Sequence, residues 1–343
     1  MKLRVIADDL TGALDAAAPF AAPGAPVRMR AGPQPMAAGD RLTLSTESRD
    51  RSAKTAAKRA EAAFAAMRAG SGPGTLWFKK VDSVLRGHPL EETLAMARAG
   101  GFATCVFAPA FPEMGRITRG GRQLVRQGAG EWKETPQGDL RAAFAALTPA
   151  HAPLEMIIPD AETPEALERA IRPWRGRPGV LWAGSRGLAQ ALAGPVAPLP
   201  RPDVGLFVIG TSHPATRAQV AGLAGHAQAA PETGPIAPNA AAPLILDPVP
   251  HCASGAATHA ALKAALPRLA PSRDGGAILV TGGDCLSILL AHIGAEALDC
   301  LGEIGPGLPL SRIVGGRMEG AGVISKSGGF GASDQLRLML RRQ

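Results

Sequence analysis

Acidic and hydroxyl side chains crowd together directly after the first apolar run of the chain. The run Leu3–Ala7 has the β-branched content of a buried strand, and the polar group behind it consists of Asp8, Asp9, Thr11 and Asp15. Ligands of open α/β sheets bind beyond the carboxyl ends of the strands, so this position suits a site. Asp and Thr also cap helices, but one cap needs only one such residue. The segment is therefore interpreted equally well as a site and as a helix start.

A second polar group follows another strand-like run, Thr75–Lys80. Its members are Lys79, Lys80, Asp82, Ser83 and Arg86. An arginine can hold a carboxylate in two parallel hydrogen bonds, and a lysine and a hydroxyl beside it would suit a hydroxylated carboxylic acid. The competing interpretation is a salt-bridged loop.

Glycines mark the ends of two strand-like runs in the second half of the chain. The segment Ala277–Asp284 ends in two glycines and a carboxylate before the apolar helix predicted over Leu286–Ile293, and Val323–Gly331 combines Lys326 with hydroxyls and glycines. Glycines let the backbone approach a phosphate, and a helix N-terminus supplies N–H groups. Neither segment has the order of a P-loop, and each alone could be a tight turn.

Hydroxyl groups also follow the run Leu206–Ile209. Thr211 or Ser212 could cap the helix predicted from Pro214 onward or donate to a phosphate, and His213 is interpreted as a neighbour of the cap. His251 and His259 would make a weak metal pair, because no acidic third ligand accompanies them.

Composition narrows the classes of partner. Nine Phe, four Trp and no Tyr in 343 residues argue against the aromatic platforms that bind single-stranded nucleic acid. The formal charge of +8 favours anionic partners such as acidic small molecules or nucleotides. Four arginines with nearly helical spacing, Arg116, Arg119, Arg122 and Arg126, would line one helix face, which we interpret as solvated for all but Arg116.

The cysteines and the apolar runs predict a soluble cytoplasmic protein. The four cysteines show neither CxxC pairs nor zinc-ligand spacing, which fits a reducing compartment. The N-terminal apolar run is interrupted by Asp8 too early for a signal peptide, and no run approaches the ~18 residues that span a bilayer. Dimers are the common default for soluble enzymes, and a homodimer is expected on that ground alone.

Strand-like runs alternate with helical patterns, which predicts βαβ units and mostly parallel sheets. The runs are Leu42–Thr46, Thr75–Lys80, Cys105–Pro109, Met156–Pro159 and Val180–Ala183, then Leu206–Ile209, Leu244–Leu246, Ala277–Thr281, Arg312–Val314 and Gly322–Ser325. A helix is predicted within 50–69, and a surface loop over 229–243. The Pro-rich passage 194–202 shows neither the helical nor the strand repeat of apolar residues and is interpreted as a linker. We expect two α/β domains, residues 1–195 and 204–343 joined by 196–203, with the active site in the cleft between them.

Seven motifs in this order resemble the four-carbon acid sugar kinase family across nearly the whole chain. They are IADDLTGALD, FKKVDSVLRG, PAFPEMGRIT, AGSRGLA, GTSHPATRAQ, TGGD and KSGGFG. The resemblance implies a sugar-acid-binding N-terminal domain and a nucleotide-binding C-terminal domain. It further implies phosphorylation by ATP of the terminal hydroxyl of threonate, erythronate or a 3-oxo-tetronate.

The resemblance also implies roles for individual residues. Those expected to be catalytic are Asp8, Asp9 and Arg86; those expected to bind the sugar acid are Asp15, Lys80, Asp82, Ser83 and Arg116; those expected to meet ATP are Ser212, Gly282, Gly283, Asp284, Cys285, Gly328 and Gly329. Asp8 or Asp9 would orient the attacking hydroxyl, and Arg86 would grip the substrate carboxylate. Mg²⁺ would bridge the ATP phosphates, with no protein ligand assigned to it.

Three features depart from the family pattern. Cys285 stands where threonine is usual, Gly329 where asparagine is common, and the segment 120–139 fits poorly. The first two suggest an alternative, a sugar-acid or nucleotide sensor that retains the fold without turnover. A Mg²⁺-dependent phosphohydrolase is a second alternative, although the adjoining Asp8 and Asp9 do not meet the D-x-D-x-T spacing.

Overall fold

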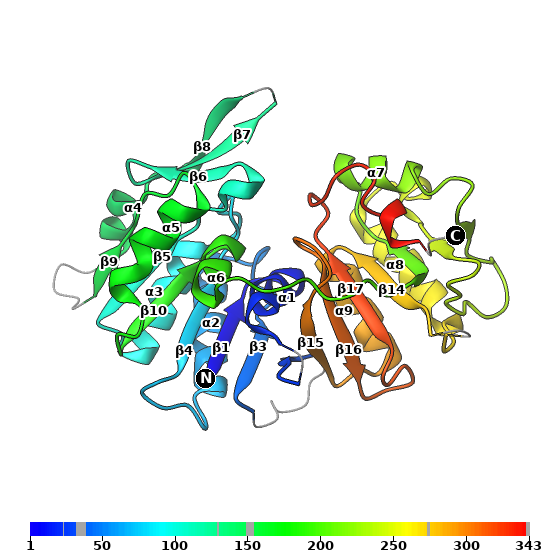
Figure 1. The fold of residues 1–343 in the computed structure, drawn as a ribbon, viewed down its shortest axis with the longest axis horizontal. Coiled ribbons are helices and arrows are strands. Elements are labelled where there is room, and N and C mark those ends of the chain that lie inside the picture. The colour runs from blue at the N-terminus through cyan, green and yellow to red at the C-terminus, as the bar shows by residue number, and fades with distance from the viewer. Residues whose placement is uncertain (23, 32–38, 129, 149–153, 273–274, 341–343) are drawn as a thin grey trace. The chain divides into compact units, whose positions relative to one another are not determined.

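The chain forms two compact units, each with a core of β-strands (Figure 1). The computed structural model describes residues 1–343 except 23, 32–38, 129, 149–153, 273–274 and 341–343. The first unit contains Met1–Phe20 and the chain from residue 39 to Val196. The second contains Ala21 to residue 31 and the chain from Ala197 onward, so the segment around Val27–Arg30 lies in the second unit although it comes early in the sequence.

The first unit has a parallel sheet with the strand order β3-β1-β4-β10-β5-β9. Its helices form two groups, one on each face (Figure 1): α2, α3 and α4 pack together, and so do α1, α6 and α5. The strands are β1 (Leu3–Ala7), β3 (Arg41–Ser45), β4 (Leu76–Lys80), β5 (Thr104–Ala108), β9 (Glu155–Ile157) and β10 (Val180–Gly184). The helices are α1 (Leu10–Ala17), α2 (Ala53–Met67), α3 (Pro89–Gly100), α4 (Leu140–Leu147), α5 (Pro164–Ile171) and α6 (Arg186–Ala193), with 3₁₀ turns at Ala18–Phe20, Pro112–Met114 and Arg172–Trp174.

Helix α2 illustrates how the sequence positions these elements. Ser52 accepts a hydrogen bond from the Thr55 amide at its start, and the side chains at helical spacing from Ala56 to Met67 are buried against the sheet. This confirms the helix predicted within 50–69. Every strand-like run predicted in this half is also a strand, with ends that differ by one or two residues.

The arginine-rich segment forms antiparallel strands, so the helical interpretation of its spacing was wrong. Strands β6 (Arg116–Arg119), β7 (Arg122–Gln127) and β8 (Glu131–Asp139) make a separate sheet, and the β7–β8 hairpin projects from the first unit (Figure 1). The reason lies in Gly120 and Gly121, whose positive φ angles of 58° and 72° close a two-residue hairpin turn that a helix cannot contain.

The second unit combines parallel and antiparallel strands. The order β12-β13-β11-β14-β17 is parallel, and β16, β15 and β2 continue the sheet in antiparallel fashion. The strands are β2 (Val27–Arg30), β11 (Val204–Ile209), β12 (Gln228–Ala229), β13 (Leu244–Leu246), β14 (Ala277–Thr281), β15 (Ala297–Glu303), β16 (Pro309–Val314) and β17 (Gly322–Lys326). The helices are α7 (Pro214–Ala221), α8 (Gly255–Ala265) and α9 (Gly283–Ile293), with 3₁₀ turns at Val249–His251, Leu266–Arg268 and Arg337–Met339.

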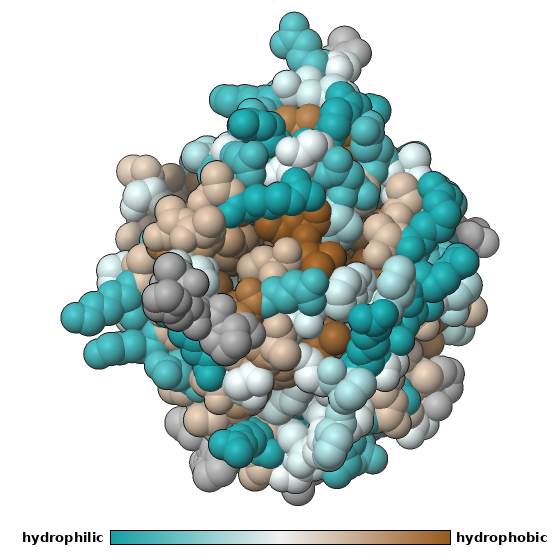
Figure 2. All heavy atoms as spheres, turned by 90° about the vertical axis from the view of Figure 1, so that its left-hand side faces the viewer, coloured by the Kyte–Doolittle hydropathy of each residue, from teal (hydrophilic) through white to brown (hydrophobic). Residues whose placement is uncertain are grey.

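The segments predicted to lack regular structure do lack it. No helix or strand interrupts the chain between Ala193 and Val204 or between residues 230 and 243, where every residue is described. All four cysteines are unbridged. Among the described residues, no helix is long and apolar enough to cross a bilayer. Seen from the side of the first unit, polar side chains cover most of the surface, and apolar ones gather near the middle (Figure 2).

Candidate active site

Three loops meet at the carboxyl edge of the first sheet. Strand β1 lies between β3 and β4, so the chain passes from β1 to one side and returns to the other. Such a reversal opens a crevice beyond the strand ends, which is where ligands bind in sheets of this type. The loops after these three strands carry Asp8 and Asp9, Arg49, and the segment from Asp82 to Arg86.

Arg49 joins the two neighbouring aspartates. Its Nε and Nη2 donate to the two carboxylate oxygens of Asp8 at 2.7 and 2.9 Å, and its Nη1 donates to Asp9 Oδ2 at 2.7 Å. Backbone bonds from Thr46 to Ala7 and from Ser48 to Asp8 hold the two loops together. The analysis of the sequence missed Arg49. The available signal was its place just behind the predicted strand Leu42–Thr46, the same kind of position that identified Asp8.

Asp9 is both a helix cap and a member of the cluster, so the two interpretations of this segment hold together. Its Oδ1 accepts from the Gly12 amide at 2.8 Å and its Oδ2 from the Thr11 hydroxyl at 3.0 Å. Its side chain is 21% exposed, whereas that of Asp8 is 5% exposed. A β-carbon at Gly12 would collide with Asp9 and lie 3.4 Å from Lys80 Nζ, which places Lys80 at the start of α1.

The surrounding cations keep the carboxylates of Asp8 and Asp82 ionised. Burial raises the pKa of Asp8, but the charge and hydrogen bonds of Arg49, together with Lys79 and Lys80, outweigh it and the pKa is lowered. Burial likewise raises the pKa of Asp82, but the hydrogen bonds and charge of Arg86 outweigh this effect, so the pKa of Asp82 is lowered. The cluster thus sets four basic side chains, Arg49, Lys80, Arg86 and Arg116, against the three acidic ones of Asp8, Asp9 and Asp82, an excess of basic groups that suits an anionic substrate.

Two of the residues expected to contact the substrate are already paired with charged side chains of the protein. Arg86 donates from Nε and Nη2 to both oxygens of Asp82 at 2.9 Å, so its guanidinium fork is occupied by a protein carboxylate. Asp15 lies 3.5 Å from Arg186 at the start of α6. Lys79, by contrast with Lys80, forms a fully buried pair with Glu92 at 2.6 Å and belongs to the core.

The β6–β8 sheet holds the loop that carries Asp82 and Ser83. Gln123 on β7 is buried; its Nε2 donates to the carbonyls of Ser83 at 2.7 Å and Pro109 at 3.3 Å, and its Oε1 accepts from Thr118 at 2.8 Å. Gln137 on β8 donates to the carbonyl of Leu85 at 2.9 Å. Leu85 has a φ of 59°, which a branched side chain rarely adopts, so the loop needs such support.

Replacing Gln123 with leucine is expected to lower kcat/KM roughly tenfold to a hundredfold, since small displacements of positioning groups have effects of this size. The side chain keeps its volume but leaves the Ser83 carbonyl without its donor, at a cost of about 1–3 kcal/mol in stability. Gln190→Leu is the matched control, because Gln190 donates to a carbonyl at the end of α6, away from this loop. Steady-state kinetics on both variants would contradict the assigned role if they were equally active.

The second unit places three glycine-containing loops side by side. They follow β11, β14 and β17, which are neighbours in the sheet, and the Gly282 amide donates to the Lys326 carbonyl at 3.0 Å. A β-carbon at Gly328 would lie 2.7 Å from the Thr211 hydroxyl, and one at Gly329 would lie 3.3 Å from the His213 ring. Larger residues would therefore close the space between the first and third loops.

The start of α9 offers backbone donors. Gly282 is its N-cap, with a φ of 94°, and no side chain of the described residues caps the helix. Asp284, in the first turn of this helix, is exposed, and so is Ser212 in the loop after β11. Cys285 is buried, and a β-carbon at Gly210 would overlap its sulfur. Burial, with the charge of Asp284, raises the pKa of this thiol to about 12, so Cys285 acts as a neutral packing residue.

Helix α7 anchors the loop after β17. Thr216 Oγ1 donates to the Gly328 carbonyl at 2.7 Å, and Gln219 Nε2 lies within 3.0 Å of the carbonyls of Phe330, Gly331 and Ala332. The cap of this helix is His213, whose Nδ1 accepts from the Ala215 amide, so the interpretation of His213 as a neighbour of the cap was wrong. Of the two roles considered for Thr211 and Ser212, capping is therefore not the one observed: Thr211 Oγ1 accepts from the His213 amide at 3.2 Å, one residue before the helix begins.

Lys326 is a buried cation that the sequence analysis did not place at the site. Its ammonium donates to Thr216 Oγ1 at 2.9 Å and to the Ser327 carbonyl at 3.2 Å, and it forms no ion pair with a described residue. Burial lowers the pKa of this lysine from 10.5 to about 8.

A pH dependence of stability follows from this shift. Between about pH 8 and 10.5 the folded lysine is neutral while the unfolded one is protonated, so the free energy of unfolding rises with pH over that window, by up to about 3 kcal/mol. Urea unfolding of the wild type and of Lys326→Met at pH 7 to 10 isolates the effect, because the variant should lack this rise. The exposed Lys263 in α8 provides the control Lys263→Met. Parallel curves for the wild type and Lys326→Met would contradict the prediction.

The residues of the second unit fit a nucleotide phosphate but do not form a metal site of their own. Gly282 and the uncapped first turn of α9 present N–H groups, and the glycine loop behind Lys326 lies next to them. His259 lies 3.8 Å from Asp284, and no group of three His, Cys, Asp or Glu side chains in the described part of the chain could hold a metal ion.

Two protein families match the chain in series. The family described as a sugar-binding N-terminal domain matches residues 3–151, and the family described as a nucleotide-binding C-terminal domain matches residues 248–336. The first match contains every polar residue of the first cluster, and the second contains the loops at Gly282 and Lys326. Ser212 lies between the two matches.

Curated relatives and solved structures resemble the chain over almost its whole length. A D-threonate kinase of Bordetella bronchiseptica is 30% identical, with 97% of this chain and 95% of that protein aligned. A D-threonate kinase of Cupriavidus necator is also 30% identical, over 91% and 90%. A solved structure from Salmonella typhimurium LT2 has a TM-score of 0.72 at 20% identity, covering 99% of both chains, and one from Haemophilus influenzae has a TM-score of 0.63 at 17% identity, covering 98% of both.

Proposed function

This chain belongs to the four-carbon acid sugar kinase family, and from that premise we propose that it transfers the γ-phosphate of ATP to the terminal hydroxyl of D-threonate. It is a kinase, a phosphotransferase with an alcohol group as acceptor. Three relatives at 28–30% identity carry the same substrate in their names, and this agreement supports D-threonate ahead of erythronate and the 3-oxo-tetronates.

The observation that carries the proposal is the mixed cluster of the first unit. A four-carbon sugar acid has one carboxylate and several hydroxyls, and the cluster offers cations for the first and ionised carboxylates for the second. We assign the grip on the substrate carboxylate to Lys80 and Arg116, because the fork of Arg86 is already bound to Asp82. Arg86 then acts by holding Asp82.

Asp9 is the residue we assign to the attacking hydroxyl. Both aspartates accept hydrogen bonds from protein groups at both oxygens, but the side chain of Asp8 is 5% exposed whereas that of Asp9 is 21% exposed and reaches solvent. Asp9 accepts a hydrogen bond from the hydroxyl and receives its proton as the oxygen attacks phosphorus. Arg49 holds both aspartates in place through its hydrogen bonds to their carboxylates. Phosphoryl transfer depends mostly on such positioning and on charge neutralisation.

The nucleotide is assigned to the three loops of the second unit. Backbone N–H groups from Gly282 to Cys285 and the loop at Gly328 and Gly329 would hold the phosphates, with Ser212 beside them. Mg²⁺ would be held mainly by phosphate oxygens and water, as is usual for this ion. Cys285 and Gly329 do not argue for a sensor without turnover, because the cysteine packs neatly under Gly210 and the glycine leaves room beside His213.

The test is ADP release with Mg-ATP against a panel of D- and L-threonate, D- and L-erythronate and their 3-oxo forms. We expect D-threonate to give the highest kcat/KM. ADP release with another acid alone would replace the substrate but keep the kinase. Release of inorganic phosphate from a sugar-acid phosphate, without ATP, would support the phosphohydrolase instead.

A further inference from the structure

A fully buried salt bridge lies behind the polar cluster of the first unit. Lys79 Nζ on β4 and Glu92 Oε2 on α3 are 2.6 Å apart, and neither side chain reaches solvent. Replacing such a pair with apolar side chains of similar volume often leaves stability unchanged or increases it, so stability alone does not account for this pair. The further hydrogen bonds of both side chains lead to the loops at the carboxyl edge of the sheet.

Glu92 holds the loop that follows β3. Its Oε1 accepts from the Ser48 hydroxyl at 2.7 Å, and the Ser48 amide donates to the Asp8 carbonyl at 3.0 Å. Ser48 immediately precedes Arg49, whose guanidinium joins Asp8 to Asp9. The place of Arg49 therefore depends on Glu92 through a single buried hydrogen bond.

The loop after β3 needs support from outside. Glu47, two residues beyond the strand, has a φ of 47°, which residues with a side chain rarely adopt. Arg59 on α2 donates to the carbonyls of Thr46 and Glu47 at 2.9 and 2.8 Å. The loop is thus held at two carbonyls by Arg59 and at the Ser48 hydroxyl by Glu92.

Lys79 holds the end of β4. Besides its pair with Glu92, its ammonium donates to the Lys80 carbonyl at 2.8 Å. Lys80 is the last residue of β4 and is assigned to the substrate carboxylate. Because β1 lies between β3 and β4, the one buried pair reaches the chain on both sides of Asp8 and Asp9.

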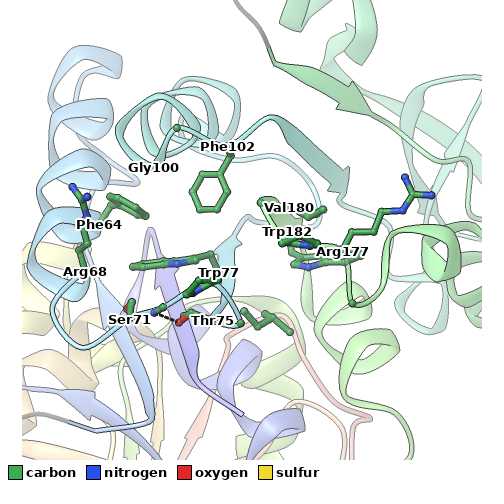
Figure 3. Close-up of a pocket in the computed structure, with 18 of the residues that line it drawn as sticks. Phe64, Arg68, Ser71, Thr75, Trp77, Gly100, Phe102, Arg177, Val180 and Trp182 are labelled. Carbon is green, nitrogen blue, oxygen red and sulfur yellow. Dashed lines mark hydrogen bonds between the residues drawn. The ribbon is translucent and has the colours of Figure 1, made fainter.

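The helix that carries Glu92 is anchored at its other end. Figure 3 shows Gly100, the last residue of α3, beside Phe64 and Phe102. A β-carbon at Gly100 would overlap Phe102 and lie 2.9 Å from Phe64, and Phe64 packs on Trp77 of β4 with ring centroids 4.4 Å apart. Because such close-packed interiors yield little, α3 places Glu92 at a fixed position relative to the sheet.

We propose that Glu92 is a positioning residue for phosphoryl transfer. From α3 it fixes Arg49 through Ser48, and it fixes Lys80 through Lys79. This inference rests on the proposed function, in which Arg49 holds the two aspartates and Lys80 grips the substrate carboxylate. Loss of the Ser48 contact should let Arg49 move relative to the aspartates.

Two double variants that differ in one group test this role. Lys79→Met with Glu92→Gln keeps an acceptor for the Ser48 hydroxyl, whereas Lys79→Met with Glu92→Leu removes it at similar volume. Both lack the charge of Lys79, one of the cations that lower the pKa of Asp8, so that effect cancels in the comparison. We expect kcat/KM for D-threonate to be roughly tenfold to a hundredfold lower with leucine than with glutamine. A role in packing alone predicts at least equal activity for leucine, the better core residue.

The Arg49 Nε–H signal in the NMR spectrum of ¹⁵N-labelled full-length protein gives a readout that needs no activity. Arg49 Nε donates to Asp8, and its signal is assigned by its loss in Arg49→Lys. It should stay near its wild-type position in the glutamine variant and move or broaden in the leucine variant, while the Arg28 Nε–H of the second unit stays unchanged in both. The same Arg49 signal and the same kcat/KM in the two variants would overturn the proposal. Wild-type protein that phosphorylates no acid would refute the proposed function, and the Arg49 signal would still decide whether Glu92 supports this loop.

Ser48→Ala breaks the same contact from the loop and covers the case of a leucine variant that does not fold. It should lower kcat/KM roughly tenfold, with no further loss when combined with Lys79→Met and Glu92→Leu, because that background already lacks the contact. The matched control is Thr93→Val, which removes a buried hydroxyl that donates to the Pro89 carbonyl within α3 at 2.6 Å and should leave kcat/KM unchanged. Equal activity of Ser48→Ala and Thr93→Val, or fully additive losses in the combined variant, would contradict the role of Glu92.

Discussion

Asp9→Asn is expected to lower kcat roughly a hundredfold to ten-thousandfold, the range found for general acid–base groups. The amide cannot accept the proton of the attacking hydroxyl. It can still accept from the Gly12 amide, because asparagine caps helices about as well as aspartate does. The fold of the first unit should therefore survive, and steady-state kinetics with D-threonate would measure the loss.

The matched control is Asp139→Asn. Asp139 caps α4 in the same unit by accepting from the Arg141 and Ala142 amides, and it lies outside the cluster. Its kcat should equal that of the wild type. If Asp9→Asn also retained full turnover while the double change of Asp8 and Asp9 to alanine did not, Asp8 would be the residue that orients the hydroxyl. Full turnover in the double variant would defeat the site assignment.

Arg49→Leu is expected to destabilise the first unit by about 3 kcal/mol and to remove most activity, because the buried carboxylate of Asp8 loses its partner. Lys79 and Lys80 still act on Asp8, which places the effect at the low end for a broken buried pair. Urea unfolding at neutral pH measures it. Arg119→Leu is the control, since the pair of Arg119 with Glu162 is exposed on both sides and should contribute little to the free energy of unfolding.

The pH dependence of this variant distinguishes a lost ion pair from lost packing. In the wild type the pKa of Asp8 is lowered, so its contribution to stability is present above the unfolded value of 3.8 and disappears as the pH falls through the folded value. In Arg49→Leu, the effect of burial, which raises the pKa of Asp8, is no longer opposed by Arg49. The Asp8 carboxyl therefore takes up a proton at a higher pH than in the wild type. The stability difference between the two proteins should therefore shrink from pH 7 towards pH 5. A constant difference would indicate a packing effect.

The repeating parts of the fold could be predicted from the sequence because they obey local rules. Leu3–Ala7 has the β-branched content of a buried strand, and the apolar residues of α2 recur at helical spacing. The structure has a strand and a helix at these places. The β6–β8 sheet could not be predicted in this way. Its arginines have helical spacing, and the decisive feature is the turn at Gly120 and Gly121, which is recognisable only when the flanking residues are already considered as strands. The antiparallel strand β2 pairs with β15, far away in the sequence, and no local pattern announces such a partner.

The site could be predicted where a polar group follows a strand and not where its role depends on a distant partner. Asp8, Asp82 and Gly282 were found by their position behind apolar runs. Arg49 was missed because its importance lies in the two carboxylates it reaches across the sheet. Arg86 was assigned to the substrate because the sequence does not reveal that Asp82 occupies its fork.

The transfer itself is best measured by ³¹P NMR of a reaction that contains the full-length protein, Mg-ATP and D-threonate. We expect the γ-phosphate signal to be replaced by that of a phosphomonoester coupled to the terminal CH₂ of the acid, at a rate that Asp9→Asn reduces and Asp139→Asn does not. ATP that remains intact, or that yields inorganic phosphate without a phosphomonoester, would contradict the assignment of this chain as a D-threonate kinase.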